Sequence, residues 1–153
     1  MSLVTCLLIM LGGAIGTLLR YLISLLTTTA PHQLPWATIA INIAGSFLIG
    51  FFGTLTLSHG RFPVSEDARL FVMVGLCGGF TTFSSFSLQT FDLMRSGSLL
   101  RAGVNVVASV VLCVCAVACG HLIAAHFNRD AVAIAQLSTE EEASFLPPRN
   151  QSS

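Results

Sequence analysis

Four long runs without a charged side chain dominate the sequence, and the charged residues lie between or after them. A helix of about 22 residues is roughly 33 Å long, which matches a membrane hydrocarbon core of about 30 Å. The runs lack the strict alternation of apolar and polar residues that barrel strands show. They cover residues 3–19, 36–57, 70–91 and 102–125, and the first continues past Arg20 to about Thr27. The pattern therefore predicts four transmembrane helices, over about residues 3–27, 36–58, 69–95 and 100–126.

Short connections join the four runs, so residues 1–127 are predicted to form one membrane domain. No Lys or Arg precedes the first run, and its apolar part is long for a signal peptide. We therefore expect it to stay in place as the first helix. Residues 128–153 carry three consecutive glutamates at 140–142 and two prolines at 147–148. This composition predicts a solvated, disordered C-terminal tail, with a short helix over 131–143 as the alternative.

Composition excludes a soluble domain. Apolar side chains make up 54% of the 153 residues and charged ones only 9%, and the mean hydropathy is +0.82. A soluble domain carries about 25% charged residues. The formal net charge is zero, so no net field attracts nucleic acid. We expect an integral membrane protein that contacts lipid and has no nucleic-acid partner.

Arginine placement gives no preferred orientation in the membrane. Four spans put equal numbers of arginines beside the lipid on the two sides, so the positive-inside rule makes no choice. Either the insertion machinery imposes one orientation, or the chain inserts both ways and pairs as an antiparallel dimer. Arg61, Arg69 and Arg129 lie on one side, and Arg20, Arg95 and Arg101 lie on the other.

Small residues four apart occur in three of the runs. This spacing lets two helix backbones approach closely. The spacing alone does not distinguish packing within one chain from packing between chains. The pairs are Gly12 and Gly16, Ser46 and Gly50, and Gly75 and Gly79.

Polar residues repeat every four positions in the second and fourth runs, which places each set on one helix face. Polar side chains are costly in lipid, so they face a partner helix or a cavity. They form either hydrogen bonds between helices or a polar path. The sets are Thr38, Asn42 and Ser46, and Asn105, Ser109 and Cys113.

Glycines followed by hydroxyl side chains interrupt the third run, at residues 75–87 (GLCGGFTTFSSFS). Glycine costs about 1 kcal/mol per helix position, and Ser and Thr offer the backbone other hydrogen bonds. A break in the helix is therefore predicted near residues 78–84. Broken backbone at membrane depth is buried in protein or lines a cavity, and its carbonyls commonly coordinate a cation. Phe83 and Phe86 are expected to point the same way, either toward a cavity or into ordinary packing.

With these segments in view, the sequence resembles the small fluoride channels of the Fluc or CrcB family, over about residues 8–126. The resemblance rests on residues 12–21 (GGAIGTLLRY), 36–50 (WATIAINIAGSFLIG) and 75–87. It implies an all-α membrane protein that assembles as an antiparallel, dual-topology homodimer. Such a dimer has two anion pores and one structural sodium ion on its two-fold axis. It would also account for the balanced arginines.

The resemblance assigns roles to individual residues. The backbone carbonyls of Gly78 and Thr81 match the family's sodium site, and oxygen is the donor that a hard cation prefers. Asn42, Phe83 and Phe86 match pore-lining residues, where an amide N–H and the positive edges of phenyl rings favour a small anion. Further polar positions along the pore match Thr38, Ser84 and Ser109.

Two other residues affect this expectation. Cys113 stands where the family often has a serine one turn beyond Ser109, and a thiol is a weaker hydrogen-bond donor than a hydroxyl. Conduction is still expected, with its rate or selectivity altered. Arg20, at the end of the first run, either attracts anions into a vestibule or anchors the helix at the membrane interface.

The function implied is passive, fluoride-selective conduction out of the cell across the cell inner membrane, which lowers fluoride toxicity. Neutral hydrogen fluoride enters from an acidic medium and dissociates in the cytoplasm, and fluoride then leaves down its electrochemical gradient. The sequence contains no nucleotide-binding motif. An intramembrane enzyme is not expected, because His121 is the only imidazole well inside a run and no carboxylate accompanies it.

Two alternatives stay open. Small multidrug exporters also have four spans and dual topology. A resemblance to them would imply proton-coupled transport through a glutamate inside the first helix. Here the first acidic residue is Glu66, in a connection. A purely structural membrane subunit is the other alternative, although residues 75–87 would then have no evident purpose.

Overall fold

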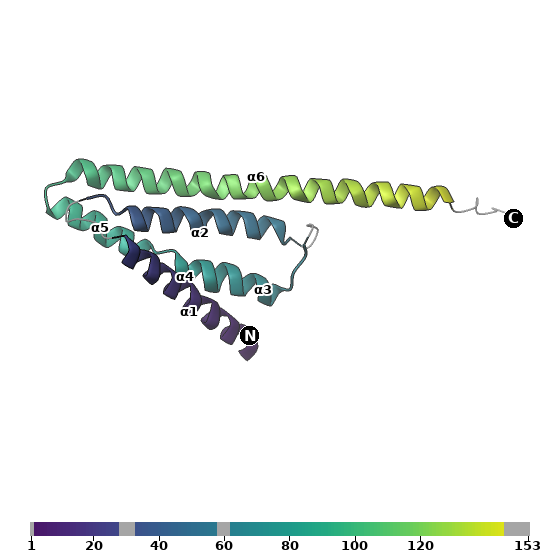
Figure 1. Ribbon diagram of the computed structural model, residues 1–153, viewed down its shortest axis with the longest axis horizontal. Helices are drawn as coiled ribbons and strands as arrows, with labels where there is room; N and C mark the ends of the chain where they lie inside the picture. The colour runs from purple at the N-terminus through teal and green to yellow at the C-terminus, as the bar shows by residue number, and fades with distance from the viewer. Residues whose placement is uncertain (1, 28–32, 58–61, 146–153) are drawn as a thin grey trace.

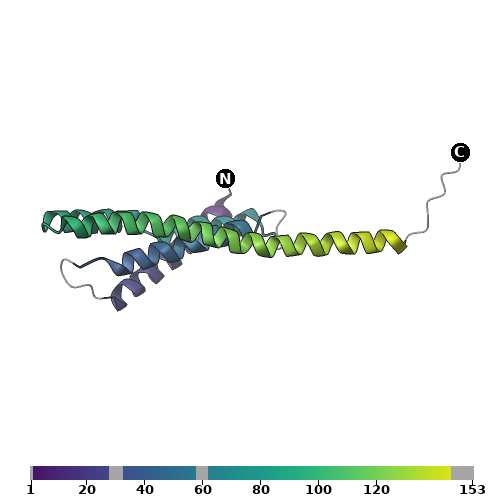
Figure 2. The same ribbon diagram turned by 90° about the horizontal axis from the view of Figure 1, so that it is seen from above.

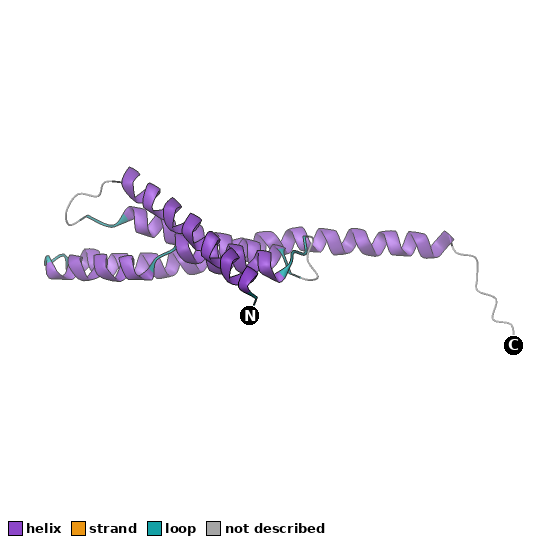
Figure 3. Ribbon diagram, turned by 90° about the horizontal axis from the view of Figure 1, so that it is seen from below, coloured by secondary structure: helices purple, strands orange, loops and turns teal. Residues whose placement is uncertain are grey.

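The computed structural model describes residues 2–27, 33–57 and 62–145, and side chains as far as residue 129 (Figure 1). All regular structure in these ranges is helical (Figure 3). One element, η1, is a π-helix. The elements are α1 (Leu3–Leu26), α2 (Trp36–Leu55), α3 (Glu66–Leu70), η1 (Phe71–Cys77), α4 (Gly78–Phe80), α5 (Phe83–Arg95) and α6 (Leu99–Phe145).

Four segments are long and apolar enough to cross a membrane, as the sequence predicted. They are Leu3–Leu26, Trp36–Leu55, Glu66–Arg95 and Leu99–Arg129. Large apolar side chains cover the outside, for example Leu3 at 76% and Leu100 at 82% exposure. A surface of this kind is stable in lipid and not in water. The protein is therefore a multi-pass, all-helical membrane protein.

The helices pack in two parallel pairs rather than as sequential hairpins. α1 lies along η1 and α4, and α2 lies along α6 (Figure 1). Glycines make the first pair possible, because a Cβ on Gly75 would lie 2.8 Å from the Ile9 carbonyl oxygen, and one on Gly79 would lie 2.5 Å from the Gly13 carbonyl oxygen. These small residues therefore serve close backbone packing within one chain.

The pair of α2 and α6 also depends on glycine. A Cβ on Gly120 would lie 2.7 Å from the Phe51 amide nitrogen, and one on Gly50 would collide with the backbone of Val117. The Ser46 and Gly50 spacing therefore places Gly50 against α6 of the same chain. The sequence did not say whether the three small-residue pairs pack within one chain or between chains. Each pair contributes at least one glycine to a contact within the chain.

Helix ends differ from the sequence prediction mainly at α6. This helix continues to Phe145 and extends past the other helices (Figure 2), although the sequence predicted a disordered tail from residue 128. No Gly or Pro occurs between His121 and Phe145, and Ala, Leu, Gln and Glu, which favour helix, are frequent there. The first eighteen residues of the predicted tail are thus helical, and the remainder, 146–153, lies outside the described residues.

Capping residues define the start of α3 and the end of α5. Ser65 accepts a hydrogen bond from the Ala68 amide, 3.3 Å long, at the start of α3, where Glu66 and Asp67 favour the helix N-terminus. After α5, Gly97 has φ +77°, and the Ser98 amide donates to the Leu93 carbonyl oxygen. The glycine reverses the chain into α6.

Candidate functional site

Thr81 and Thr82 separate α4 from α5 with extended backbone. Thr81 has φ −79° and ψ 157°, and Thr82 has φ −151° and ψ 112°. Helix α4 ends when the Thr81 amide and hydroxyl both donate to the Cys77 carbonyl oxygen, each at 2.9 Å. The third membrane-capable segment therefore contains two consecutive residues whose backbone groups need partners outside the helix.

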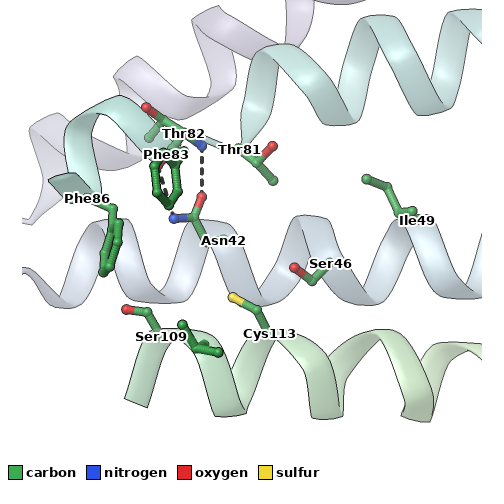
Figure 4. Close-up of a pocket in the computed structure, with 10 residues that line it drawn as sticks. Asn42, Ser46, Ile49, Thr81, Thr82, Phe83, Phe86, Ser109 and Cys113 are labelled. Carbon is green, nitrogen blue, oxygen red and sulfur yellow. Dashed lines mark hydrogen bonds between the residues drawn. The ribbon is translucent and has the colours of Figure 1, made fainter. Parts of the chain in front are cut away.

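Asn42 of α2 supplies those partners for Thr82 (Figure 4). Its Oδ1 accepts from the Thr82 amide at 2.8 Å, and its Nδ2 donates to the Thr82 carbonyl oxygen at 3.1 Å. The side-chain amide thus replaces a neighbouring peptide group. Because the Thr82 amide binds Asn42, it does not close a further helical turn on the Gly78 carbonyl.

Hydroxyl groups begin the next helix. The Thr82 side chain accepts a hydrogen bond from the Ser85 amide at 3.2 Å and so caps α5. The same Oγ1 lies 3.2 Å from Ser84 Oγ and donates to Ser85 Oγ at 3.1 Å. The Thr82 hydroxyl thus satisfies the Ser85 amide at the start of α5 and is itself held by two serine hydroxyls.

A cavity of about 280 Å³ lies between α2, the extended pair and α5 on one side and α6 on the other (Figure 4). It contains five of the residues that the sequence assigned to a pore, namely Asn42, Phe83, Phe86, Ser109 and Cys113. It also contains residues that were not assigned to the pore, namely Ser46, Ile49, Thr81, Thr82 and Val110. No charged side chain is among these lining residues.

Two phenylalanines form one end of this cavity. The ring centroids of Phe83 and Phe86 are 5.4 Å apart, and their planes are tilted by 43°. Phe83 is 78% exposed, whereas Phe86 is half-buried and faces Ser109 of α6 (Figure 4). Tilted rings offer their edges, which carry partial positive charge, to a ligand between them.

Thr38 and Ser84 do not line this cavity. Thr38 is 6% exposed and lies one turn before Asn42 on α2. Ser84 is exposed, and its hydroxyl lies beside Thr82. Neither residue lines the cavity, although the Ser84 hydroxyl contacts Thr82, which does.

Arg20 contacts the end of α4. Its Nε donates to the Gly79 carbonyl oxygen at 3.1 Å, and Thr17 Oγ1 lies 3.5 Å from the same oxygen. A cation at the C-terminal end of a helix stabilises the free carbonyls there. The half-buried Arg20 thus ties α1 to the residues just before the extended pair.

The described residues contain no group of three or more His, Cys, Asp or Glu side chains that could hold a metal ion. Oxygen donors are nevertheless available at the backbone. Gly78 is exposed, and a Cβ placed on it would meet nothing within 4 Å. Its carbonyl lacks the helical donor that Asn42 has taken. Such an oxygen fits a hard monovalent cation.

A buried hydrogen-bond network links α6 to α5 next to the cavity. Asn105 is 0% exposed, and its Nδ2 donates to Thr90 Oγ1 at 2.8 Å. Thr90 Oγ1 in turn donates to the Phe86 carbonyl oxygen at 2.7 Å. Among the described residues, Asn105 Oδ1, Ser109 Oγ and Gln89 Oε1 are buried without a hydrogen-bond partner. The four-residue polar repeat in α6 pointed to Asn105 and Ser109, but nothing in the sequence singled out Gln89.

Comparison with known proteins places the sequence in one family. Residues 7–121 match the family described as CrcB-like protein, Camphor Resistance (CrcB). A protein of Methylobacterium radiotolerans named fluoride-specific ion channel FluC is 67% identical over 93% of this chain and 99% of its own length. One of the same name from Gluconobacter oxydans is 62% identical over 94% of this chain and 100% of its own length.

More distant relatives carry the same name. The protein of Paramagnetospirillum magneticum is 54% identical over 80% of this chain and 96% of its own length. These names describe channels, so the chain is grouped with transport proteins and is not an enzyme. The family match includes most of each of the four membrane-capable segments and all residues that line the cavity. This chain therefore belongs to the CrcB family.

Proposed function

We propose that this protein is a fluoride-selective channel that lets fluoride leave the cell passively. The observation that carries the proposal is the cavity, in which an amide, a hydroxyl and phenyl edges meet without a charged residue. The relatives named fluoride-specific ion channels support the choice of ion. The cell inner membrane is the proposed location, and the outward gradient supplies the driving force.

Dehydration is the main physical problem for such a channel. Fluoride is small and strongly hydrated, so the path must replace several hydrogen bonds without binding the ion too tightly to release it. Ser109 has a hydroxyl hydrogen with no acceptor in the described protein, and Asn42 has a second amide hydrogen besides the one bound to Thr82. Together with the ring edges of Phe83 and Phe86, these neutral donors match that requirement.

Cys113 lines the same cavity. Its thiol donates a hydrogen bond more weakly than a serine hydroxyl, and it is larger. In this proposal Cys113 lowers the strength of one contact without closing the path. Thr38 and Ser84 have at most a secondary role, because they lie outside the cavity lining.

A second copy of the chain completes the path in this proposal. The cavity is open, Phe83 at its end is largely exposed, and six arginines are shared equally between the two sides. An antiparallel, dual-topology homodimer accounts for all three observations. Lipid covers the apolar outer faces of the remaining helices.

The third span is broken inside the membrane in this proposal, at Thr81 and Thr82. Their extended dihedral angles support this, as does the use of Asn42 to satisfy the Thr82 backbone. The freed carbonyls of Gly78 and Thr81 would hold a structural sodium ion at the dimer centre. The ion would supply positive charge that fixes the two broken segments, and it would take no part in conduction.

Ion efflux from liposomes tests the proposal directly. Purified protein is reconstituted, valinomycin clamps the voltage, and fluoride and chloride electrodes record release in parallel. Fast fluoride release without chloride release is expected. If fluoride stays inside liposomes that contain correctly folded protein, the proposal is wrong, and drug transport or a structural role should be tested next.

A further inference from the structure

The extended residues between α4 and α5 leave backbone carbonyls without the donors that a continuous helix would give them. The Thr82 amide, which would pair with the Gly78 carbonyl oxygen, is bound to Asn42 instead. The Ser85 amide, which would pair with the Thr81 carbonyl oxygen, is bound to the Thr82 hydroxyl. Free carbonyls at a helix end carry partial negative charge. Inside a membrane, such groups need a donor or a cation.

One carbonyl of this turn already has a cation beside it. The Gly79 carbonyl oxygen accepts from Arg20 Nε at 3.1 Å, and Thr17 Oγ1 lies 3.5 Å from the same oxygen. Both donors come from α1, which packs so closely here that a Cβ on Gly16 would lie 2.8 Å from the Phe80 amide nitrogen. Arg20 is half-buried, and a guanidinium group keeps its charge. A positive charge is therefore fixed next to the freed carbonyls.

We propose that Arg20 is a positioning residue that serves as a built-in cation for the extended turn. It occupies the Gly79 carbonyl and leaves the carbonyls of Gly78 and Thr81 to the proposed sodium ion, so this inference rests on the proposed function. Arg20 denies the ion a further ligand, and its charge repels the ion. Sodium therefore stabilises this turn less than it would stabilise a turn whose Gly79 carbonyl was also free.

The sodium dependence of thermal unfolding tests this role. Purified full-length protein is unfolded in sodium chloride and in N-methylglucamine chloride of equal ionic strength, because the organic cation is too large for a site made of carbonyls. A bound ion raises the unfolding midpoint. Methionine has neither the donor nor the charge, so sodium should raise the midpoint of Arg20→Met about twice as much as that of wild type, or more.

Arg95→Met is the matched control. It removes the same charge from an exposed position at the end of α5 and should respond to sodium as wild type does. An equal sodium effect in Arg20→Met and wild type would overturn the inference, and so would an Arg95→Met variant that behaves like Arg20→Met. If no variant responds to sodium, the inference and the sodium site are both wrong. Fluoride efflux from wild-type liposomes tests the channel separately.

A crystal structure of the wild-type protein grown in sodium keeps the inference testable if Arg20→Met does not fold. It should show an ion bound by the carbonyl oxygens of Gly78 and Thr81, while the Gly79 oxygen stays bound to Arg20. An ion that binds the Gly79 oxygen would refute the inference.

Discussion

Two regions of this protein differ in how they are packed: the glycine contact of α1 with η1 and α4, and the cavity between α2, α5 and α6, which lies beside the glycine contact of α2 with α6. Between α1 and the η1 and α4 segment, glycines bring two backbones together with no room for a Cβ. Around α2, α5 and α6, side chains stand apart far enough to leave a cavity, and buried polar atoms remain without partners. The first region packs backbone against backbone, and the second keeps buried polar atoms without partners beside a cavity. Burial and hydrogen bonding, rather than hydrophobicity, distinguish the two regions.

The strongest way to break this comparison is to add bulk to the glycine-packed pair. Gly75→Leu places a side chain where a Cβ already lies 2.8 Å from the Ile9 carbonyl oxygen. We expect a cost of about 3 kcal/mol and loss of most folded protein. Recovery of monodisperse protein in detergent measures it. Gly103→Leu on α6 is the control, because a Cβ there meets nothing within 4 Å, and equal losses from both variants would argue against the special role of the first pair.

Replacing both phenylalanines of the cavity should abolish most transport while leaving the fold intact. Phe83→Ile with Phe86→Ile removes two ring edges worth about 1–1.5 kcal/mol each, so fluoride efflux should fall roughly a hundredfold. Phe91→Ile on the outer part of α5 is the matched control and should conduct normally. Normal efflux from the double variant would exclude the rings from the path.

Asn42→Leu should have the next largest effect. It removes both hydrogen bonds to the Thr82 backbone, so the extended pair loses its support and efflux should fall about tenfold or more. The thermal midpoint should fall as well. Ser46→Ala, one turn along α2 and also in the cavity lining, serves as the control. If the two variants behave alike, Asn42 is only one of several lining residues.

Arg20 ties α1 to α4 within the first region, and its substitution separates two interpretations of it. If it stabilises α4 through the bond from Nε to Gly79, both Arg20→Lys and Arg20→Gln lose that contact, and efflux falls about threefold at any ionic strength. If it instead attracts anions, Arg20→Lys conducts normally and Arg20→Gln loses most at low salt. Efflux measured at two ionic strengths decides between them.

Cys113→Ser should have the smallest effect. A hydroxyl is a better donor than a thiol, and the change of volume is small, so fluoride efflux should change by no more than about twofold. Stability should be unaffected. A larger change would place Cys113 at the narrowest point of the path.

Much of the fold could be predicted from hydropathy, because a membrane permits few alternatives to a long apolar helix. All four predicted spans are present, and the predicted ends of the first two lie within a few residues of the ends of α1 and α2. The end of α6 was not, since helix propensity beyond the last apolar run carries on to Phe145. The π-helix over Phe71–Cys77 was also missed, because a periodicity of about 3.6 residues does not reveal a wider turn.

The site was predictable in its residue types and less so in their contacts. Asn42, Phe83, Phe86, Ser109 and Cys113 do share one cavity. The sequence did not show that Asn42 binds Thr82, because the two are forty residues apart and only the folded chain brings them together. Spacing likewise did not say whether the glycine pairs pack within or between chains, since it specifies one face and not its partner.

The parallel pairing of the helices has a consequence for biogenesis. Each close interface joins spans that are not consecutive, α1 with η1 and α4, and α2 with α6. A nascent chain that has released only its first two spans therefore lacks both partners. The close backbone contacts between α2 and α6 at Gly50 and Gly120 form only after the last span has entered the bilayer. We expect truncation before α6 to leave a species that cellular quality control removes, because one complete helix pair would be missing.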